Sequence, residues 1–133
     1  MRRSTHAILV TAVVLAVGAP GATAKESMDV SVCGGSRCAS VAGLDARITD
    51  SYAWVRAPSP APFYTIRPTR PGVTPGLSGT LVYLPRKGIW RVRLEGVYVW
   101  LDVPFTNEPI LRRAVRTLRP CPRSRSWACA RPA

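Results

Sequence analysis

The fold is decided by the stretch from Leu81 to Val103, which reads Leu-Val-Tyr-Leu-Pro-Arg-Lys-Gly-Ile-Trp-Arg-Val-Arg-Leu-Glu-Gly-Val-Tyr-Val-Trp-Leu-Asp-Val. Three runs of alternating residues are separated by two turn signals, Arg86-Lys87-Gly88 and Glu95-Gly96. Alternation with a period of two is typical of strands, and short Gly-containing links between strands are typical of hairpins. The stretch therefore predicts a three-stranded antiparallel meander.

The second turn defines the pairing between the last two strands of the meander. A two-residue turn at Glu95-Gly96 places Leu94 opposite Val97, and the other pairs follow by counting outward. One face of this hairpin then carries only apolar residues, and we expect it to be the core face. Its residues are Trp90, Val92, Leu94, Val97, Val99 and Leu101.

The opposite face of the same hairpin carries two arginines and two aromatic residues. The register places Arg91 opposite Trp100 and Arg93 opposite Tyr98, so we expect each guanidinium to lie over the ring across from it. Aromatic rings interleaved with Arg on an exposed sheet face can stack bases or sugars. This strip is therefore a candidate binding surface, unless the N-terminal strands cover it or it is simply a solvated face.

The first turn of the meander leaves two registers open. With a three-residue turn at Arg86-Lys87-Gly88, Leu84 lies opposite Trp90, and both Val82 and Leu84 join the core face. A two-residue turn slips the register and moves these side chains to the other face. We expect the three-residue turn, because it buries the two apolar side chains.

An N-terminal hairpin is predicted upstream of the meander. The runs Met28–Cys33 and Arg37–Val41 flank the turn Gly34-Gly35-Ser36. Cys33 and Cys38 lie on either side of this turn, so we expect a local disulfide that closes the hairpin. A zinc site is disfavoured, because neither cysteine pair in the chain has the two-residue knuckle spacing.

The segment between the hairpin and the meander carries weaker signals. Ala42–Ser51 suggests a single helical turn, and Tyr52–Arg56 suggests a strand. Pro58–Pro62 predicts an extended polyproline spacer over the domain surface, because each Pro fixes its own φ and disfavours helix in the residue before it. Phe63–Arg67 predicts a strand, and Pro68–Gly79 predicts a loop rich in Pro and Gly.

A C-terminal helix is predicted after the meander. Pro104 ends the sheet, and Thr106 or Asn107 can cap the helix, with Glu108 in the first turn where the helix dipole favours an acid. Apolar residues recur at helical spacing, at Leu111, Ala114, Val115 and Leu118. Arginines occupy much of the remaining surface, at Arg112, Arg113, Arg116 and Arg119. Pro120 stops the helix. The sequence thus predicts an α+β fold, in which a small antiparallel sheet (meander plus N-terminal hairpin) carries one amphipathic helix packed on the core face of the meander.

Residues 1–24 are predicted to be a secretory signal peptide. Arg2-Arg3 forms a positive start, Ala7–Val17 is a short apolar run, and Ala22-Thr23-Ala24 is a small-residue cleavage site. The apolar run is shorter than the about 20 residues that span a bilayer, so no membrane span is expected after cleavage. We expect a secreted chain with a single α+β domain over residues 25–120 and a Cys-bounded basic tail over 121–133.

The basic composition is compatible with an anionic partner but also with the coding bias of a GC-rich genome, since nearly all the cations are Arg, and the composition disfavours catalysis. The formal net charge is +12, with 19 Lys and Arg against 7 Asp and Glu, and a basic surface attracts anionic envelope polymers. Because the protein is exported, nucleic acid is not expected as a partner. The only histidine, His6, lies in the predicted signal peptide, which removes Ser-His pairs, Cys-His pairs and His-containing metal sites. The carboxylates show no paired spacing, so the sequence predicts a non-catalytic protein without a metal or cofactor.

Four motifs together resemble small secreted proteins of actinobacteria. They are Val-Cys-Gly-x-x-x-Cys at residues 32–38, the Pro/Ala spacer that runs into Phe63–Arg67, Tyr83–Gly88 and Leu111–Leu118. The resemblance covers most of the chain from residue 25 to Pro120. It implies no particular activity.

The tail Cys121–Cys129 reads Cys-Pro-Arg-Ser-Arg-Ser-Trp-Ala-Cys. Its Cys-to-Cys spacing resembles the reactive loop of Bowman–Birk trypsin inhibitors. The resemblance implies that Arg123 fills the primary pocket of a protease and that Ser124 follows it. The tail departs from that family because Ser126-Trp127 replaces its prolines and Pro122 replaces its Thr.

The sequence leaves the pairing of the tail cysteines open. Cys121 and Cys129 can close a local ring, or they can be bonded back to Cys33 and Cys38. Only the ring presents a free-standing loop. The sequence therefore predicts a secreted non-catalytic protein that binds an extracellular or envelope partner, such as an anionic polymer. The alternative is an inhibitor of an extracellular trypsin-like protease.

Overall fold

One antiparallel sheet and one helix form the part of the chain that the computed structural model describes, residues 27–47, 54–69 and 77–129. In chain order the elements are β1 (Ser27–Cys33), β2 (Cys38–Asp45), β3 (Tyr64–Pro68), β4 (Leu77–Leu84), β5 (Ile89–Leu94), β6 (Val97–Asp102) and α1 (Glu108–Val115). The predictions for residues 1–24, 48–53 and 70–76 lie outside the described residues. The α+β prediction is confirmed in outline, since an antiparallel sheet is combined with a helix.

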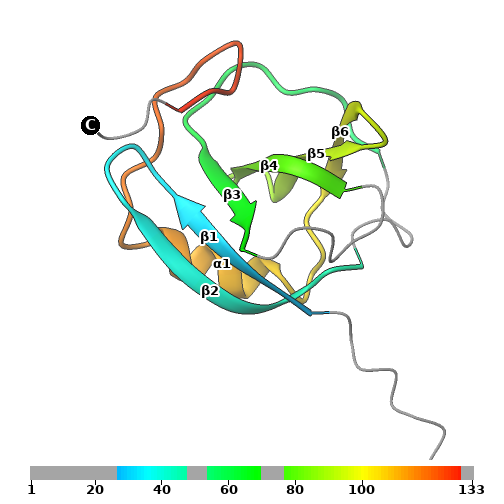
Figure 1. Cartoon of the computed structure of the whole chain (residues 1–133). Helices are drawn as coiled ribbons and strands as arrows, with labels where there is room; N and C mark the ends of the chain where they lie inside the picture. Colours follow the sequence, from blue (N-terminus) through cyan, green and yellow to red (C-terminus); the bar gives the residue numbers. More distant parts are fainter. Residues whose placement is uncertain (1–26, 48–53, 70–76, 130–133) are drawn as a thin grey trace, which may run out of the picture.

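The strand order of the sheet is β2-β1-β3-β4-β5-β6, and every neighbouring pair is antiparallel. The strand β3 therefore joins the N-terminal hairpin β1–β2 to the meander β4–β5–β6. The sheet is curved, and α1 lies against β1 and β2 (Figure 1).

The hairpin β5–β6 has the predicted register. Leu94 lies opposite Val97, and all the predicted pairs follow outward from this one. Glu95 (φ 50°) and Gly96 (φ 81°) are both left-handed, as a two-residue turn of type I′ requires. Gly adopts this conformation without a steric cost, which is why the Glu-Gly pair was a reliable turn signal.

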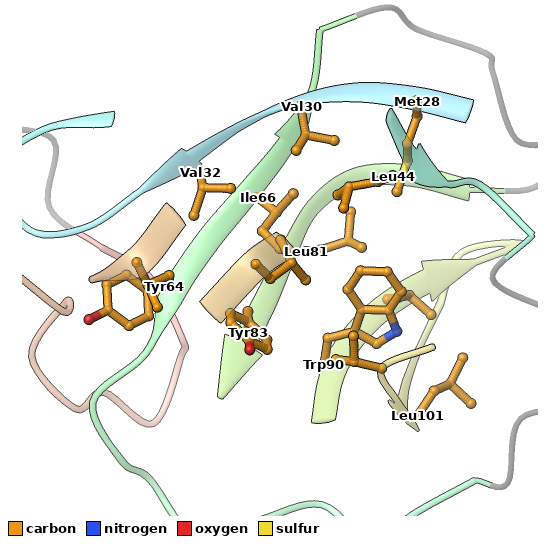
Figure 2. Close-up of a cluster of buried hydrophobic side chains, with 14 of the residues drawn as sticks. Met28, Val30, Val32, Leu44, Tyr64, Ile66, Leu81, Tyr83, Trp90 and Leu101 are labelled. Atoms are coloured by element: carbon orange, nitrogen blue, oxygen red, sulfur yellow. The ribbon is translucent and has the colours of Figure 1, made fainter. Parts of the chain in front are cut away.

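One cluster of buried side chains lies between the sheet and α1. It includes Val30 of β1, Ile66 of β3 and Leu111 of α1. Figure 2 shows that side chains from β1 and from β5–β6 belong to the same cluster, which the curvature of the sheet allows. The predicted core face of β5–β6 contributes Trp90, Val92, Val99 and Leu101. Leu94 is partly buried, and Val97 is 59% exposed because it follows the turn on an edge strand.

The predicted register of the β4–β5 hairpin is wrong. The turn contains the four residues Pro85–Gly88, and Tyr83 lies opposite Trp90. Tyr83 therefore shares the core face with Trp90, while Val82 and Leu84 belong to a cluster on the opposite face. The preference for the three-residue turn assumed that only one face of the meander is buried. Both faces are buried, so burial of Val82 and Leu84 does not distinguish the registers.

The N-terminal hairpin and its disulfide are confirmed. Cys33 pairs with Cys38 across the turn, and the two are bonded with their Cα atoms 4.0 Å apart. The strand β2 continues to Asp45, so the prediction of a helical turn is wrong for residues 42–45.

Asn107 holds the start of α1 against the end of β2. Its buried side chain accepts a hydrogen bond from the backbone N–H of Asp45 (2.7 Å) and donates one to the carbonyl of Asp45 (3.0 Å). Asn107 makes no side-chain cap bond, so the predicted capping role is replaced by this tertiary contact. The helix consequently packs on β1 and β2, rather than across the meander as predicted.

The meander is linked to α1 by the side chain of Arg112. Its guanidinium donates to the carboxylate of Glu108 one helical turn earlier (2.8 Å) and to the carbonyl of Pro85 in the β4–β5 turn (3.3 Å). The hydrogen bond to Glu108 and the negative charge of its carboxylate raise the pKa of Arg112.

The segment after α1 is attached to the β1–β2 hairpin. The helix ends at Val115, earlier than the predicted stop at Pro120. The backbone N–H of Gly35 donates to the carbonyl of Arg119 (2.9 Å). A Cβ on Gly34 would lie 1.9 Å from the same carbonyl oxygen, so only Gly permits this approach. The contact sets the path of the chain as it enters the Cys121–Cys129 segment.

We predict that Asn107→Ala lowers the free energy of unfolding by about 1–3 kcal/mol, because it removes both hydrogen bonds to the backbone of Asp45. Urea denaturation of the variant and the parent protein measures this loss. Thr106→Ala is the matched control, since Thr106 is exposed and adjacent. Equal losses for the two variants would contradict the role assigned to Asn107.

Candidate functional site

The face of the sheet opposite α1, called the outer face, buries a second apolar cluster. Its members are Phe63, Val82, Leu84, Ile89, Trp100, Cys121 and Trp127. Two segments cover this cluster: residues 54–63, which bridge to β6 through Trp54 and Leu101, and the segment Cys121–Cys129. We expected the N-terminal strands or solvent over this face, and the structure places the C-terminal segment over part of it instead.

The segment Cys121–Cys129, called the C-terminal loop, is a closed ring. Cys121 and Cys129 form a disulfide with their Cα atoms 5.5 Å apart, so the alternative of bonds back to the N-terminal cysteines does not occur. The base of the ring is paired with Phe63 by two backbone hydrogen bonds of 2.7 and 3.2 Å. The local ring left open by the sequence is therefore the one present.

Trp127 anchors the C-terminal loop to the outer face. Its side chain is 9% exposed, and its ring lies edge-on to Trp100 (centroids 5.0 Å apart) and to Phe63 (5.5 Å). Its φ of 54° is uncommon for a bulky residue, and burial of the ring offsets the cost of this conformation. A single Trp in an otherwise polar ring was the available signal, although we interpreted it only as a departure from the Bowman–Birk pattern.

The tip of the C-terminal loop faces solvent and is internally hydrogen-bonded. Arg123 and Arg125 are exposed, and Ser124 between them is half-buried. The hydroxyls of Ser124 and Ser126 lie 2.9 Å apart, and the backbone N–H of Trp127 donates to the carbonyl of Ser124 (3.2 Å). The loop therefore presents two guanidinium groups on a backbone that is already ordered.

The Arg/aromatic strip is present, but its contacts differ from the prediction. The guanidinium carbon of Arg91 lies 4.1 Å from the ring centroid of Tyr98, and that of Arg93 lies 5.6 Å from it. Both arginines thus share Tyr98. The predicted register pair of Arg91 with Trp100 is present, but Arg91 makes its cation–π contact with Tyr98 rather than with Trp100. The ring of Trp100 packs against Trp127 instead, so Arg91 turns to its diagonal neighbour.

The strip and the C-terminal loop meet at Trp100 on the outer face, and we call their exposed residues together the basic face. Arg91 lies directly opposite Trp100 in the sheet, and Trp100 contacts Trp127 of the loop. The basic face comprises Arg91, Arg93, Tyr98, Arg123 and Arg125. Four of these residues, all but Arg125, were candidates from the sequence, but nothing in their spacing showed that the strip and the tail are neighbours.

No acid neutralises the basic face within the part of the chain that the structure describes. The ion pairs there involve Asp45, the last residue of β2, and Glu108, on α1. Arg91 is the least exposed of the four arginines, and burial lowers the pKa of its guanidinium, partly offset by Tyr98. Its Nε has no hydrogen-bond partner among the described residues. None of the four arginines is therefore held in an ion pair within the described part of the chain.

The groups on the basic face suit recognition of anions and rings. Guanidinium forks donate to carboxylates and phosphates, and an exposed ring flanked by cations can stack on a planar or sugar ring. Over residues 27–47, 54–69 and 77–129, no group of three His, Cys, Asp or Glu side chains could hold a metal ion. Within the same ranges, no helix has the length and apolar character needed to cross a bilayer.

We predict that Trp127→Ala lowers the free energy of unfolding by about 3–5 kcal/mol, the usual cost of removing a buried aromatic side chain. Urea denaturation measures the loss, with Ser126→Ala as the control in the same ring. Trp127→Phe retains an aromatic anchor and should cost less than Trp127→Ala. If all three variants unfold at the same urea concentration, Trp127 does not anchor the loop.

Comparison with known proteins identified no relative of this chain. The resemblances to actinobacterial secreted proteins and to the Bowman–Birk loop therefore rest on the sequence motifs alone. No protein-family model, curated protein or solved structure matches the chain.

Proposed function

We propose that this protein is a secreted, non-catalytic binding protein that recognises an anionic polymer of the cell envelope through its basic face. One observation carries the proposal: the strip with Arg91 and Arg93 and the loop with Arg123 and Arg125 meet at Trp100, and none of these four arginines has an acidic partner among the described residues. The formal net charge of the full chain is +12, and loss of Arg2 and Arg3 with the predicted signal peptide leaves +10 (12 − 2 = 10), which supports a charge-driven role. The predicted signal peptide and the two disulfides are compatible with an oxidising, extracellular location.

The order of the C-terminal loop supports its use in binding. A disulfide, a buried Trp127 and a turn at Ser124 hold the loop before any partner arrives. A pre-ordered loop loses less conformational entropy on binding than a free tail, so more of the contact energy contributes to affinity. Tyr98, which is 54% exposed, adds a ring that can contact the sugar units of such a polymer.

The polymer proposal predicts an unequal effect of two charge-matched double variants. Arg123→Ala with Arg125→Ala should weaken retention on an immobilised anionic wall polymer more than Arg113→Ala with Arg116→Ala at the end of α1. Retention of the parent protein should fall steeply with salt, since the Debye length shrinks from about 10 Å at 0.1 M to about 3 Å at 1 M. Equal weakening by the two double variants would exclude the basic face, and salt-insensitive or absent retention would reject charge-driven binding altogether.

A second function, inhibition of a trypsin-like serine protease, is favoured by a specific observation. The disulfide between Cys121 and Cys129 closes the ring, and Arg123 is exposed on it with Ser124 next in the chain. An Arg held on a rigid loop can enter an acidic primary pocket at low entropic cost. In this function Arg123 carries the binding by itself, whereas polymer binding uses Arg123 and Arg125 together.

The inhibitor function predicts lasting, stoichiometric loss of trypsin activity when the protein is titrated into the enzyme. Arg123→Ala should abolish the inhibition, while Arg125→Ala should leave it largely intact. Residual activity against a chromogenic substrate and mass spectrometry of the loop are the measurements. Rapid cleavage after Arg123 with recovery of full trypsin activity would rule this function out.

A further inference from the structure

A depression lies between the C-terminal loop and the proline-rich segment that crosses the outer face. Its volume is about 460 Å³, and its lining residues are Ser59, Pro60, Arg123, Ser124 and Arg125. One wall is therefore the disulfide-closed tip and the other is part of the Pro58–Pro62 spacer. The two walls come from segments that are distant in the sequence, so the depression exists only in the folded protein.

The lining of this depression is complementary to an oxyanion. Two arginines and two serines line it, and no acidic residue does. Neither Arg123 nor Arg125 forms an ion pair or a hydrogen bond within the described part of the chain. Its walls are held in place by the turn at Ser124 and by the fixed φ of Pro60.

We propose that this depression is a binding site for a phosphate group. A carboxylate has two oxygens and is matched by the fork of a single Arg, whereas a phosphate group has enough oxygens to accept from two guanidiniums together. A phosphate monoester also carries about −1.5 to −2 charge at pH 7, which balances two arginines. The volume is much larger than one phosphate group, so it accommodates the group together with the molecule that carries it.

This inference deepens the proposed function, on which it rests for the identity of the carrier. It states that the anionic units recognised at the C-terminal loop are phosphate groups. It also states that Arg123 and Arg125 bind the same phosphate group, in addition to contributing to the positive electrostatic potential of the basic face. The phosphate belongs either to a terminal monoester, with three terminal oxygens, or to a phosphodiester backbone, with two, and both present anionic oxygens on phosphorus to the guanidiniums.

Titration of the full chain with inorganic phosphate, followed by amide NMR, tests the site directly. Saturable shifts are expected at Ser59 and Ser124, and sodium chloride at equal ionic strength should not reproduce them. Arg123→Gln with Arg125→Gln should weaken phosphate binding by about tenfold or more, which corresponds to about 1.4 kcal/mol per factor of ten.

Arg86→Gln with Lys87→Gln is the matched control, because this pair lines a different depression of about 440 Å³ and removes the same charge. It should leave phosphate affinity unchanged. Shifts that never saturate, shifts that chloride reproduces, or equal weakening by the two double variants would overturn the proposal.

Two further ligands distinguish the sources of the phosphate group. Tighter binding of glycerol 3-phosphate than of dimethyl phosphate assigns a terminal monoester, and the reverse order assigns a phosphodiester. The phosphate site and the proposed polymer-binding function can be excluded independently of each other. If the protein is retained on the polymer but shows no saturable phosphate binding, the phosphate site is excluded and the proposed function stands. If it binds phosphate saturably but is not retained on the polymer, the phosphate site stands and the proposed function is excluded.

Discussion

The packing of Trp127 against Trp100 is the contact on which the organisation of this protein depends. Trp100 projects from β6 on the face that α1 does not cover, because Asn107 holds α1 against β2. Without Trp127, the outer face would expose Trp100 and Phe63 to water. Burial of aromatic surface favours the covered state, and the edge-to-face geometry adds to it. The anchor thus determines where the C-terminal loop lies.

The described part of the chain has one helix of eight residues, which covers only one face of the sheet. The other face must be covered by segments without regular secondary structure. The outer face is covered by irregular segments, which lack a hydrogen-bond ladder of their own. Each is stabilised differently. The C-terminal loop has its disulfide and its pairing with Phe63, whereas the Pro58–Pro62 segment contains prolines, which have no N–H to satisfy. Staples of this kind are typical of small domains whose cores bury limited surface.

The same anchor determines the functional surface. Trp127 brings a loop that carries Arg123 and Arg125 next to the strip that carries Arg91 and Arg93. A structural requirement, the covering of Trp100, therefore assembles four cations in one region. Because the loop is ordered by that requirement, its charges are held in a defined arrangement. We propose that this arrangement is what an anionic partner recognises.

Local signals accounted for much of the fold. Gly96 after Glu95 determines a type I′ turn, and the turn determines the β5–β6 register with its two faces. Cys33 and Cys38 lie so near in sequence that their disulfide follows from the hairpin itself. Four residues of the basic face were also identified from sequence, Arg91, Arg93 and Tyr98 in the Arg/aromatic strip and Arg123 in the Cys-bounded loop, whereas Arg125 was not.

The sequence by itself therefore determined the strands of the meander, one hairpin register, the local disulfide and the residue types available for binding. Tertiary structure decided the β4–β5 register and the position of α1 on β1 and β2. It also decided that two arginines contact Tyr98 and that the C-terminal loop packs next to the Arg/aromatic strip. Turns and periodicity act between near neighbours and are visible in the sequence. What covers each face of a sheet depends on packing between distant segments, and here one buried Trp127 in the tail decided it.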